Sequence, residues 1–351
     1  MKKSLSSLSS LSVTLIGGVG TPNKRDFSGS MSLVTIKRTS GQLYNILVDC
    51  GLSHRGESFN YINFISPKAI DLILLTHAHI DHIGMLPYIG DKNNGFKGRI
   101  IASKETLKLS NIMLNDSVSV LGKHKNNTNN ISKNNEMNNY NSLIINLKEE
   151  LSLIVSSLSN PLIGSVKSRL LNREKQMLEK EIEYISNNSG IFGNKGSRVD
   201  ELVFYSSSNI EDLFNGKNIY SLDSGELFEV VDGVSISLVN SAHILGSSQF
   251  LIKVDDGNGG NVNLGFSGDV GRYSDNNIGS PQIFDEKLDF YMIESTYGSR
   301  VHENQFDQLI RFIEDVGNLG GKIFIPVFML QRFQDVALKL INMQKKLKYD
   351  T

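Results

Sequence analysis

Three histidines and an aspartate crowd into the segment Thr76-His77-Ala78-His79-Ile80-Asp81-His82. The whole chain has 7 histidines, so this clustering is unusual for it. Imidazole nitrogens and carboxylate oxygens are ligands that zinc takes in catalytic sites, where one position stays open to water. The alternative is a polar loop that is rich in histidine by coincidence. The spacing favours a hydrolytic metal centre.

Predicted strands deliver these residues to one edge of a sheet. The histidine segment follows the apolar run at 72–75, which predicts a buried strand. His243 follows a predicted strand at 234–239, and Asp269 follows one at 262–266. A lone polar residue after a strand is usually part of a turn. Both residues become candidates here, because a two-metal site draws ligands from several strands and uses one carboxylate as a bridge.

The remaining sequence predicts stacked layers of sheet and helix. Residues 1–11 form a serine-rich lead-in that we expect to be loose. Further strands are predicted at 13–18, 32–38, 44–48, 100–102, 226–231, 250–254, 290–293 (buried) and 322–327. Helices are predicted at 104–120, 304–316 and 331–347. Many strands first, with helices between and after them, favour an α+β fold.

A segment of different composition interrupts this pattern. Asparagine, lysine and serine dominate residues 123–141, which we expect to be disordered because they cannot bury a core. Helical patterns follow at 142–158 and 165–185, the second with an apolar stripe beside charged residues. Two interpretations stay open: a helical hairpin that packs on itself, or a docking surface at 143–185 for RNA, a protein partner or a second copy.

Composition excludes several other classes. The 351 residues are 39% hydrophobic and 21% charged with a formal net charge of -1, so no overall positive field attracts nucleic acid or an anionic membrane. The single Cys50 excludes an internal disulfide and favours the cytoplasm. The Ser-Leu repeats after Lys3 are too polar for a signal peptide, and no apolar run is long enough for a membrane span.

The order of an HxHxDH segment, a lone histidine and a lone aspartate resembles the metallo-β-lactamase superfamily. Four further stretches are similar to its β-CASP branch, namely 241–248, 266–269, 294–302 and 320–335. That branch includes ribonuclease J and the endonuclease subunit of the eukaryotic pre-mRNA cleavage and polyadenylation machinery. The resemblance covers 12–121 and 202–347. It implies an αββα sandwich at 12–302 with an insertion at about 123–200, and the beginning of a β-CASP domain at 303–351.

The resemblance implies two zinc ions and assigns them six ligands. The first ion would be bound by His77, His79 and His243. The second ion would be held by Asp81 and His82, and Asp269 would bridge the two ions. A water molecule between the ions would be the nucleophile, with its pKa lowered by their charge. Manganese is the alternative metal, because availability as well as ligand type decides occupancy.

Other matching residues would support the reaction. Asp49 would accept a hydrogen bond from a ligand imidazole and fix its tautomer. Glu294, catalytic together with Asp81, would orient a metal ligand or a residue near the leaving group; its alternative is a capping carboxylate. Arg300 and His302 would contact phosphate, with surface ion pairs as the alternative.

The implied reaction is hydrolysis of phosphodiester bonds in RNA during processing or decay. Single-stranded RNA is the expected substrate, DNA is the alternative, and both endonucleolytic and exonucleolytic cutting stay open. A small-molecule ester or thioester hydrolase is disfavoured by the β-CASP-like stretch at 294–335. A non-catalytic RNA-processing scaffold is disfavoured because the metal ligands are intact.

The sequence departs from the family pattern at two points. No histidine follows His302, whereas the family has a histidine that protonates the leaving group and a last one on the second zinc. We therefore expect a fragment of a longer product, with a naturally short protein as the alternative, and weak or no activity. Gln331 stands where the family usually has glycine, although its neighbours Arg332 and Gln334 match.

Overall fold

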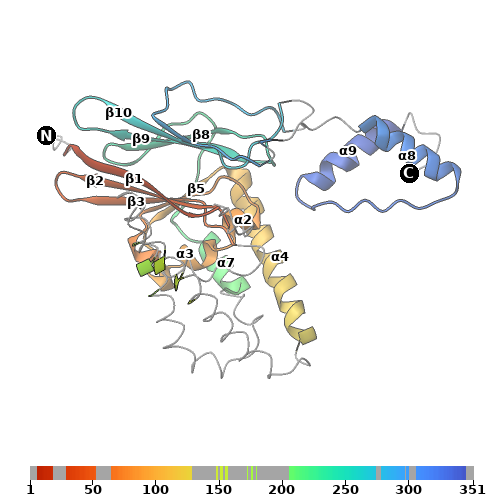
Figure 1. Cartoon of the computed structure of the whole chain (residues 1–351), viewed down its shortest axis with the longest axis horizontal. Coiled ribbons are helices and arrows are strands. Elements are labelled where there is room, and N and C mark those ends of the chain that lie inside the picture. Colours follow the sequence, from red (N-terminus) through yellow and green to blue (C-terminus); the bar gives the residue numbers. More distant parts are fainter. Residues whose placement is uncertain are drawn as a thin grey trace.

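The computed structural model describes residues 6–18, 29–52, 65–128, 205–273, 278–296, 298–299 and 306–344, with isolated positions at 148, 151–152, 155–156, 172, 175–176 and 179. Two sheets lie face to face, and helices cover the outer face of one of them (Figure 1). The predicted α+β class is confirmed. Among the described residues, three layers of the expected αββα sandwich are present.

The first sheet has six strands in sequence order. They are β1 (Leu8–Gly17), β2 (Met31–Arg38), β3 (Leu43–Val48), β4 (Leu72–Leu74), β5 (Arg99–Ala102) and β6 (Ile219–Ser221). The first three pair antiparallel, and β3 to β6 pair parallel. The loops that follow β3, β4 and β5 therefore leave the sheet at the same edge.

The second sheet has five strands in the order β11-β10-β9-β8-β7. They are β7 (Phe228–Val231), β8 (Val234–Asn240), β9 (Ser248–Asp255), β10 (Asn261–Phe266) and β11 (Phe290–Met292). Neighbours pair antiparallel from β7 to β10, whereas β11 runs parallel to β10. Since β8 and β10 both run opposite to β9, their carboxyl ends lie on the same side of the sheet.

The helices fall into two groups. Four of them pack beneath the first sheet: α2 (Ile80–Ile83), α3 (Leu86–Ile89), α4 (Lys104–Thr128) and α7 (Ser207–Phe214). The other two, α8 (Phe306–Asn318) and α9 (Arg332–Gln344), lie beside the sandwich (Figure 1). Single 3-10 turns occur at Pro67–Ala69 and Lys92–Asn94. None of the described helices is both long and apolar enough to cross a bilayer.

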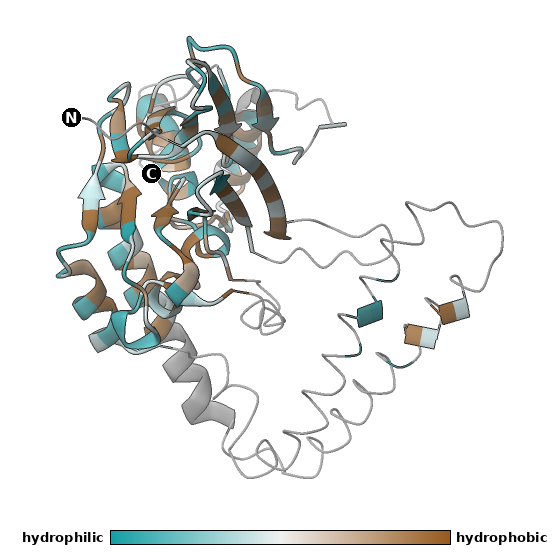
Figure 2. Cartoon of the chain, turned by 90° about the vertical axis from the view of Figure 1, so that its left-hand side faces the viewer, coloured by the Kyte–Doolittle hydropathy of each residue, from teal (hydrophilic) through white to brown (hydrophobic). Residues whose placement is uncertain are grey.

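Alternation along the central strands creates two cores. Ile46, Leu72 and Ile101 face the second sheet, while their neighbours Leu47 and Ile73 face the helices. Apolar residues occur along the strands of both sheets (Figure 2), and those that are buried make up these two cores. Because these strands are buried on both faces, they carry apolar residues at successive positions. The sequence of such a strand therefore does not show which of its residues face which layer.

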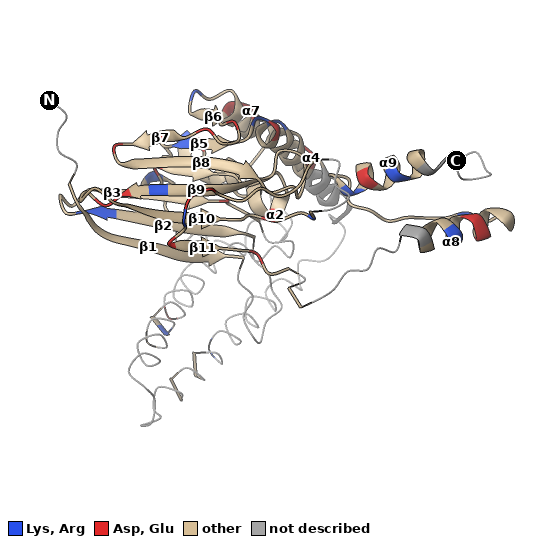
Figure 3. Cartoon of the chain, turned by 90° about the horizontal axis from the view of Figure 1, so that it is seen from above, with Lys and Arg blue, Asp and Glu red and all other residues tan. Residues whose placement is uncertain are grey.

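Charged residues are interspersed over the described strands and helices (Figure 3). Residues of both signs occur among the described strands, and the formal net charge of the chain is -1. Attraction of a polyanion must therefore depend on the site itself and on a few nearby cations.

Three expected elements differ in the structure. Strand β1 begins at Leu8, inside the lead-in expected to be loose, because its pairing with β2 extends back to Arg38. Helix α4 continues to Thr128, into the tract expected to be disordered. Strand β11 is exposed and not buried, since it is the edge strand of its sheet. The predicted helices at 142–158 and 165–185 lie largely outside the described residues.

The predicted strand at 322–327 does not form. Its residues form neither helix nor strand and are mostly exposed, with Phe324 87% exposed, and they pair with no strand among the described residues. An apolar run supplies the side chains of a strand but cannot supply a partner for its backbone groups. The proposed boundary between domains at 302–303 lies outside the described residues and stays a prediction.

Candidate metal centre

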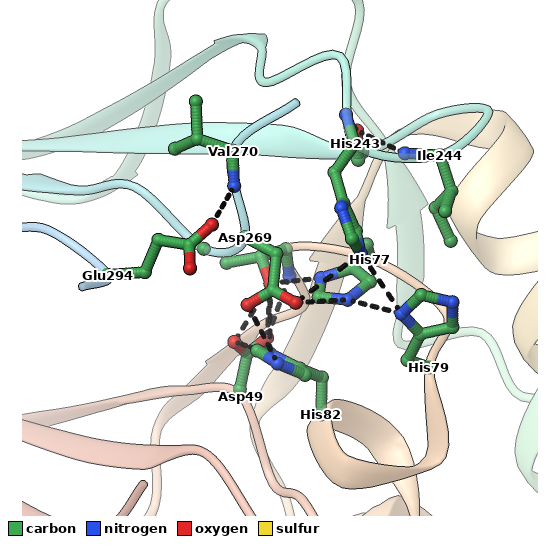
Figure 4. A network of polar contacts seen from close by, with 12 residues as sticks. Asp49, His77, His79, His82, His243, Ile244, Asp269, Val270 and Glu294 are labelled. Atoms are coloured by element: carbon green, nitrogen blue, oxygen red, sulfur yellow. Dashed lines mark hydrogen bonds and ion pairs between the residues drawn. The ribbon is translucent and has the colours of Figure 1, made fainter. Parts of the chain in front are cut away.

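Loops from both sheets meet at one edge of the sandwich (Figure 4). The histidine segment leaves β4 and enters α2, with His79 immediately before the helix. The loop after β8 carries His243, and the loop after β10 carries Asp269. The backbone N–H of Ser248 donates to the carbonyl of Thr76 at 2.8 Å, which ties the His243 loop to the first sheet.

Two glycines allow the Asp269 loop to approach its neighbours. Gly268 has a φ of +53°, and a Cβ there would lie 2.6 Å from Cβ of Thr76. A Cβ on Gly271 would lie 1.6 Å from the carbonyl oxygen of Ala242. Any larger residue at either position would push the loop away from the histidines.

Four side chains form a compact group of possible metal ligands: His77, His79, His243 and Asp269. One ligand atom from each lies within 4.8 Å of the others. The shortest contacts run from Nδ1 of His79 to Nε2 of His77, at 3.0 Å, and to Nε2 of His243, at 3.2 Å. Oδ2 of Asp269 lies 3.3 Å from Nε2 of His243 and 3.7 Å from Nε2 of His77.

The donor set of this group fits a cation. Nδ1 of His79 has at most one lone pair or one hydrogen, yet it faces two ring nitrogens within hydrogen-bond distance. Hydrogen bonding can satisfy only one of these two contacts. A metal ion among the nitrogens would give every inward-facing lone pair a partner, and the Asp269 oxygen beside them would offset its charge. The group can therefore hold a metal ion.

The second oxygen of Asp269 faces a different histidine. Oδ1 lies 3.3 Å from Nε2 of His82, whose Nδ1 lies 2.8 Å from Oδ2 of Asp49. Asp269 thus lies between the three histidines of the compact group and His82, which is the position that a bridging carboxylate requires. His82 in turn lies between two carboxylates, and Asp49 occupies the position expected of a residue that fixes its tautomer.

Thr76 fixes the protonation of His77, a role that its position in the histidine segment did not reveal. The Thr76 hydroxyl lies 2.8 Å from Oδ2 of Asp49 and 3.1 Å from Nδ1 of His77. Because a carboxylate only accepts, the hydroxyl donates to Asp49 and accepts from Nδ1–H of His77. This assignment leaves the lone pair of His77 on Nε2, which faces the group.

The His243 loop is held by its own hydroxyl. Oγ of Ser247 accepts from the backbone N–H groups of His243, at 2.9 Å, and Ile244, at 3.2 Å. Ala242 adopts a φ of +55°, which turns the chain sharply before the histidine. Ser247 lies in the stretch 241–248, but a serine four residues after a histidine gives no sequence signal for this contact.

Burial and neighbouring charge shift the pKa values in the metal-free site. Burial lowers the pKa of His77 well below its ordinary value, and the charges of His82 and His79 lower it further. Burial likewise lowers the pKa of His243 to about 4, although Asp269 opposes the shift. These two imidazoles are neutral at physiological pH, the state that binds a metal.

The surroundings of Asp269 and His82 favour the charged form of each side chain. Burial is the largest single influence on Asp269 and disfavours its ionisation, but the hydrogen bond with His82 and the charges of the surrounding histidines together outweigh burial and lower the pKa of Asp269 to about 2. Burial also disfavours the His82 imidazolium, yet the Asp49 carboxylate raises the pKa of His82 well above its ordinary value. Without a metal, a protonated His82 therefore links Asp49 to Asp269.

The other predicted site residues are placed differently. Asp81 is half-buried at the start of α2 and lies outside the compact group, although its charge acts on His79. Glu294 lies behind Asp269: its Oε1 accepts from the backbone N–H of Val270 at 2.6 Å (Figure 4). Arg300 and His302 lie outside the described residues.

Comparison with known proteins relates part of the chain to one superfamily. Residues 26–95 match the model of the metallo-beta-lactamase superfamily. Endoribonuclease YSH1 of Kluyveromyces lactis is 24% identical over 301 residues, which cover 84% of this chain and 29% of that protein. Cleavage and polyadenylation specificity factor 73 of Drosophila melanogaster is 23% identical over 302 residues, covering 84% and 32%. The chain thus spans about a third of the length of these relatives.

Solved structures overlap with the chain only weakly. The subclass B3 metallo-beta-lactamase BJP-1 of Bradyrhizobium japonicum has a TM-score of 0.31 and 14% identity, covering 72% of this chain and 60% of that one. The fold assignment therefore depends on the family match and the strand order. Together with the relatives, these confirm the resemblance drawn from the motifs.

Proposed function

We propose that this chain, which carries a metallo-β-lactamase domain and is related to endoribonucleases of the β-CASP type, is a zinc-dependent nuclease that hydrolyses phosphodiester bonds in RNA. The observation that carries the proposal is the position of Asp269 between two sets of histidines. A single site for a structural metal would need no such bridge. Single-stranded RNA is the proposed substrate, and the similarity to relatives named endoribonucleases supports it.

The donor set favours zinc over magnesium or calcium. Four imidazoles supply most of the ligand atoms, and nitrogen ligands suit zinc whereas magnesium and calcium take oxygen. Zinc bound there supplies Lewis acidity, which lowers the pKa of water and stabilises negative charge on a phosphate. We assign His77, His79 and His243 to the first ion, with Asp269 as the bridge.

The second ion would use His82 and Asp81. His82 already directs Nε2 toward Asp269, so it needs little movement. Asp81 lies outside the compact group and would have to turn toward it to bind a metal there. Asp49 keeps Nδ1 of His82 protonated, which leaves Nε2 free to bind a metal once the second proton departs.

Glu294 has a positioning role in this proposal. Its carboxylate accepts from the N–H of Val270, and its own N–H donates to Oγ of Ser267 at 3.0 Å. The first contact holds the backbone directly after Asp269, and the second holds the chain two residues before it. Glu294 therefore keeps the bridging carboxylate in place, while Arg300 and His302 are proposed to contact phosphate.

Metal content and RNA cleavage, measured on the same samples, test the proposal. Wild-type protein is compared with His77→Ala and with His124→Ala, which removes a histidine of α4 outside the group. We expect bound zinc and weak RNA cleavage in the wild type and in H124A, and the loss of both in H77A. Zinc binding without RNA cleavage, combined with thioester hydrolysis, would favour the small-molecule hydrolase instead. Absence of zinc from the wild type would favour the scaffold.

A further inference from the structure

Gln331 lies at the start of α9 with an unusual backbone conformation. Its φ of +67° is in the left-handed region, where any residue with a Cβ is strained. The residue is nevertheless only 8% exposed. A strained, buried polar residue persists where the surrounding contacts compensate for it. The contacts of its carboxamide therefore indicate what it does.

The carboxamide joins two separate elements. Oε1 of Gln331 accepts from the backbone N–H of Leu245 at 3.3 Å, and Nε2 donates to Oδ1 of Asp335 at 2.8 Å. The N–H of Asp335 also donates to the carbonyl of Gln331, which closes the first turn of α9. Leu245 belongs to the loop that carries His243. A single side chain thus connects the start of α9 to the metal centre.

The residues on either side of Gln331 are placed by this connection. Leu330 packs against the core beneath the first sheet, so the chain is held on both sides of the polar contact. Arg332 is exposed and comes directly after Gln331. Arg332 therefore begins α9 from a backbone position beside the loop that carries His243.

We propose that Gln331 is a positioning residue that clamps α9 to the His243 loop and so holds Arg332 where it binds a phosphate at the metal centre. A guanidinium suits this task, because its planar fork can donate to two phosphate oxygens at once. The phosphate part of the proposal rests on the nuclease function proposed above, whereas the clamp itself does not. The competing account is a purely structural one, in which Gln331 only begins the helix.

Gln331→Gly tests the clamp. Glycine adopts the observed φ without strain, so the variant loses the carboxamide while its fold stays intact. Hydrogen–deuterium exchange of the full chain is followed in residues 241–248 and 332–335. We expect exchange about fivefold faster in both segments, the effect of losing one typical hydrogen bond. The melting temperature should stay unchanged or rise. Gln334→Ala, at an exposed position in the same turn, is the matched control and should change neither segment.

Binding of inorganic phosphate to the zinc-loaded protein tests the role of Arg332. We expect Gln331→Gly and Arg332→Ala each to weaken phosphate binding, by roughly tenfold for Arg332→Ala. The double variant should bind no more weakly than Arg332→Ala alone, because Gln331 acts through Arg332. Zinc content should be the same in all four proteins.

Each outcome decides a separate point. Unchanged exchange in Gln331→Gly would overturn the clamp, and additive losses of phosphate affinity would overturn its action through Arg332. A melting temperature that falls together with faster exchange would support the purely structural account. Thioester hydrolysis by zinc-loaded wild type that does not cleave RNA would refute the nuclease function, but the exchange and phosphate measurements would still decide this proposal.

Discussion

The carboxylate of Asp49 lies 2.8 Å from Nδ1 of His82, on the side of the imidazole opposite to Asp269. The same carboxylate accepts from the N–H of Thr76 at 2.8 Å and from its hydroxyl. Asp49 adopts a φ of +59° to reach these donors. The buried Asp49 therefore orients two histidines of the candidate metal centre: His82 directly, and His77 through Thr76.

Asp49→Asn should weaken zinc binding without removing any ligand. The amide keeps the shape of the side chain but no longer stabilises Nδ1–H of His82 as a carboxylate does. We expect zinc affinity to fall by roughly 10- to 100-fold, the usual effect of losing such a partner. Competition with a fluorescent zinc chelator measures it. Asp91→Asn is the control, because Asp91 caps a turn elsewhere and asparagine caps equally well. Equal affinities in both variants would contradict the role of Asp49.

Asp269→Asn should disrupt the bridge itself. The amide offers one oxygen where the carboxylate offers two, and it carries no charge to offset two cations. We expect less bound metal per chain and a loss of RNA cleavage larger than the roughly 100-fold that an outer partner can cause. Metal analysis and cleavage assays on the same preparation check both effects. Retention of the full metal content would show that Asp269 does not bridge.

Gly268→Ala should destabilise the fold more than an ordinary glycine replacement. Its φ is +53°, and the new Cβ would lie 2.6 Å from Cβ of Thr76, so strain and overlap add. We expect the free energy of unfolding to fall by about 2–4 kcal/mol. Gly225→Ala is the matched control: its φ is +82°, but no atom lies within 4 Å of the added Cβ. It should lose only about 1 kcal/mol. Urea unfolding of both variants makes the comparison, and equal losses would rule out the overlap.

Stability of the metal-free protein should pass through a maximum near neutral pH. The pKa of His243 is lowered from 6.5 to about 4, so the unfolded chain binds a proton that the folded chain does not as pH falls through this window, and stability decreases. The raised pKa of His82 acts in the opposite sense: its contribution is complete below 6.5 and is lost as pH rises through the folded pKa. Urea unfolding after chelation, between about pH 4 and pH 9, measures both limbs.

His243 contributes to the acid limb of this profile together with His77. His243→Gln removes one of the groups with a lowered pKa, so the stability of the variant should fall less between pH 6.5 and pH 4 than that of the wild type. Its alkaline limb should be unchanged, because His82 is still present. A profile with the same acid limb would assign the effect to other residues.

Most of the candidate site could be predicted, because its residues follow strands. His77, His243 and Asp269 each come after an apolar run, and the carboxyl ends of β4, β8 and β10 meet at one edge of the sandwich. Spacing along one chain cannot show which hydroxyl lies between two polar groups, so Thr76 and Ser247 were not recognised. Asp81 was predicted as a ligand, and its position outside the compact group depends on how α2 begins.

The errors in the fold have a common physical origin. Strand β11 and the segment at 322–327 are both apolar, and both were predicted as strands, the first of them buried. Local sequence reports the tendency of a segment to extend, whereas burial and pairing depend on neighbours that are distant in the sequence. β11 found a partner on one side only, and 322–327 found none among the described residues.

The metal centre draws on both sheets, which has a consequence for the core between them. The first sheet carries His77, His79 and His82, whereas the second sheet carries His243 and Asp269. The buried side chains that separate the sheets, such as Val34 and Phe250, thus determine how far apart the two sets of ligands stand. Metals differ in the ligand distances that they accept. The distance between the two sheets, set by these buried side chains, would therefore influence which metal the site selects.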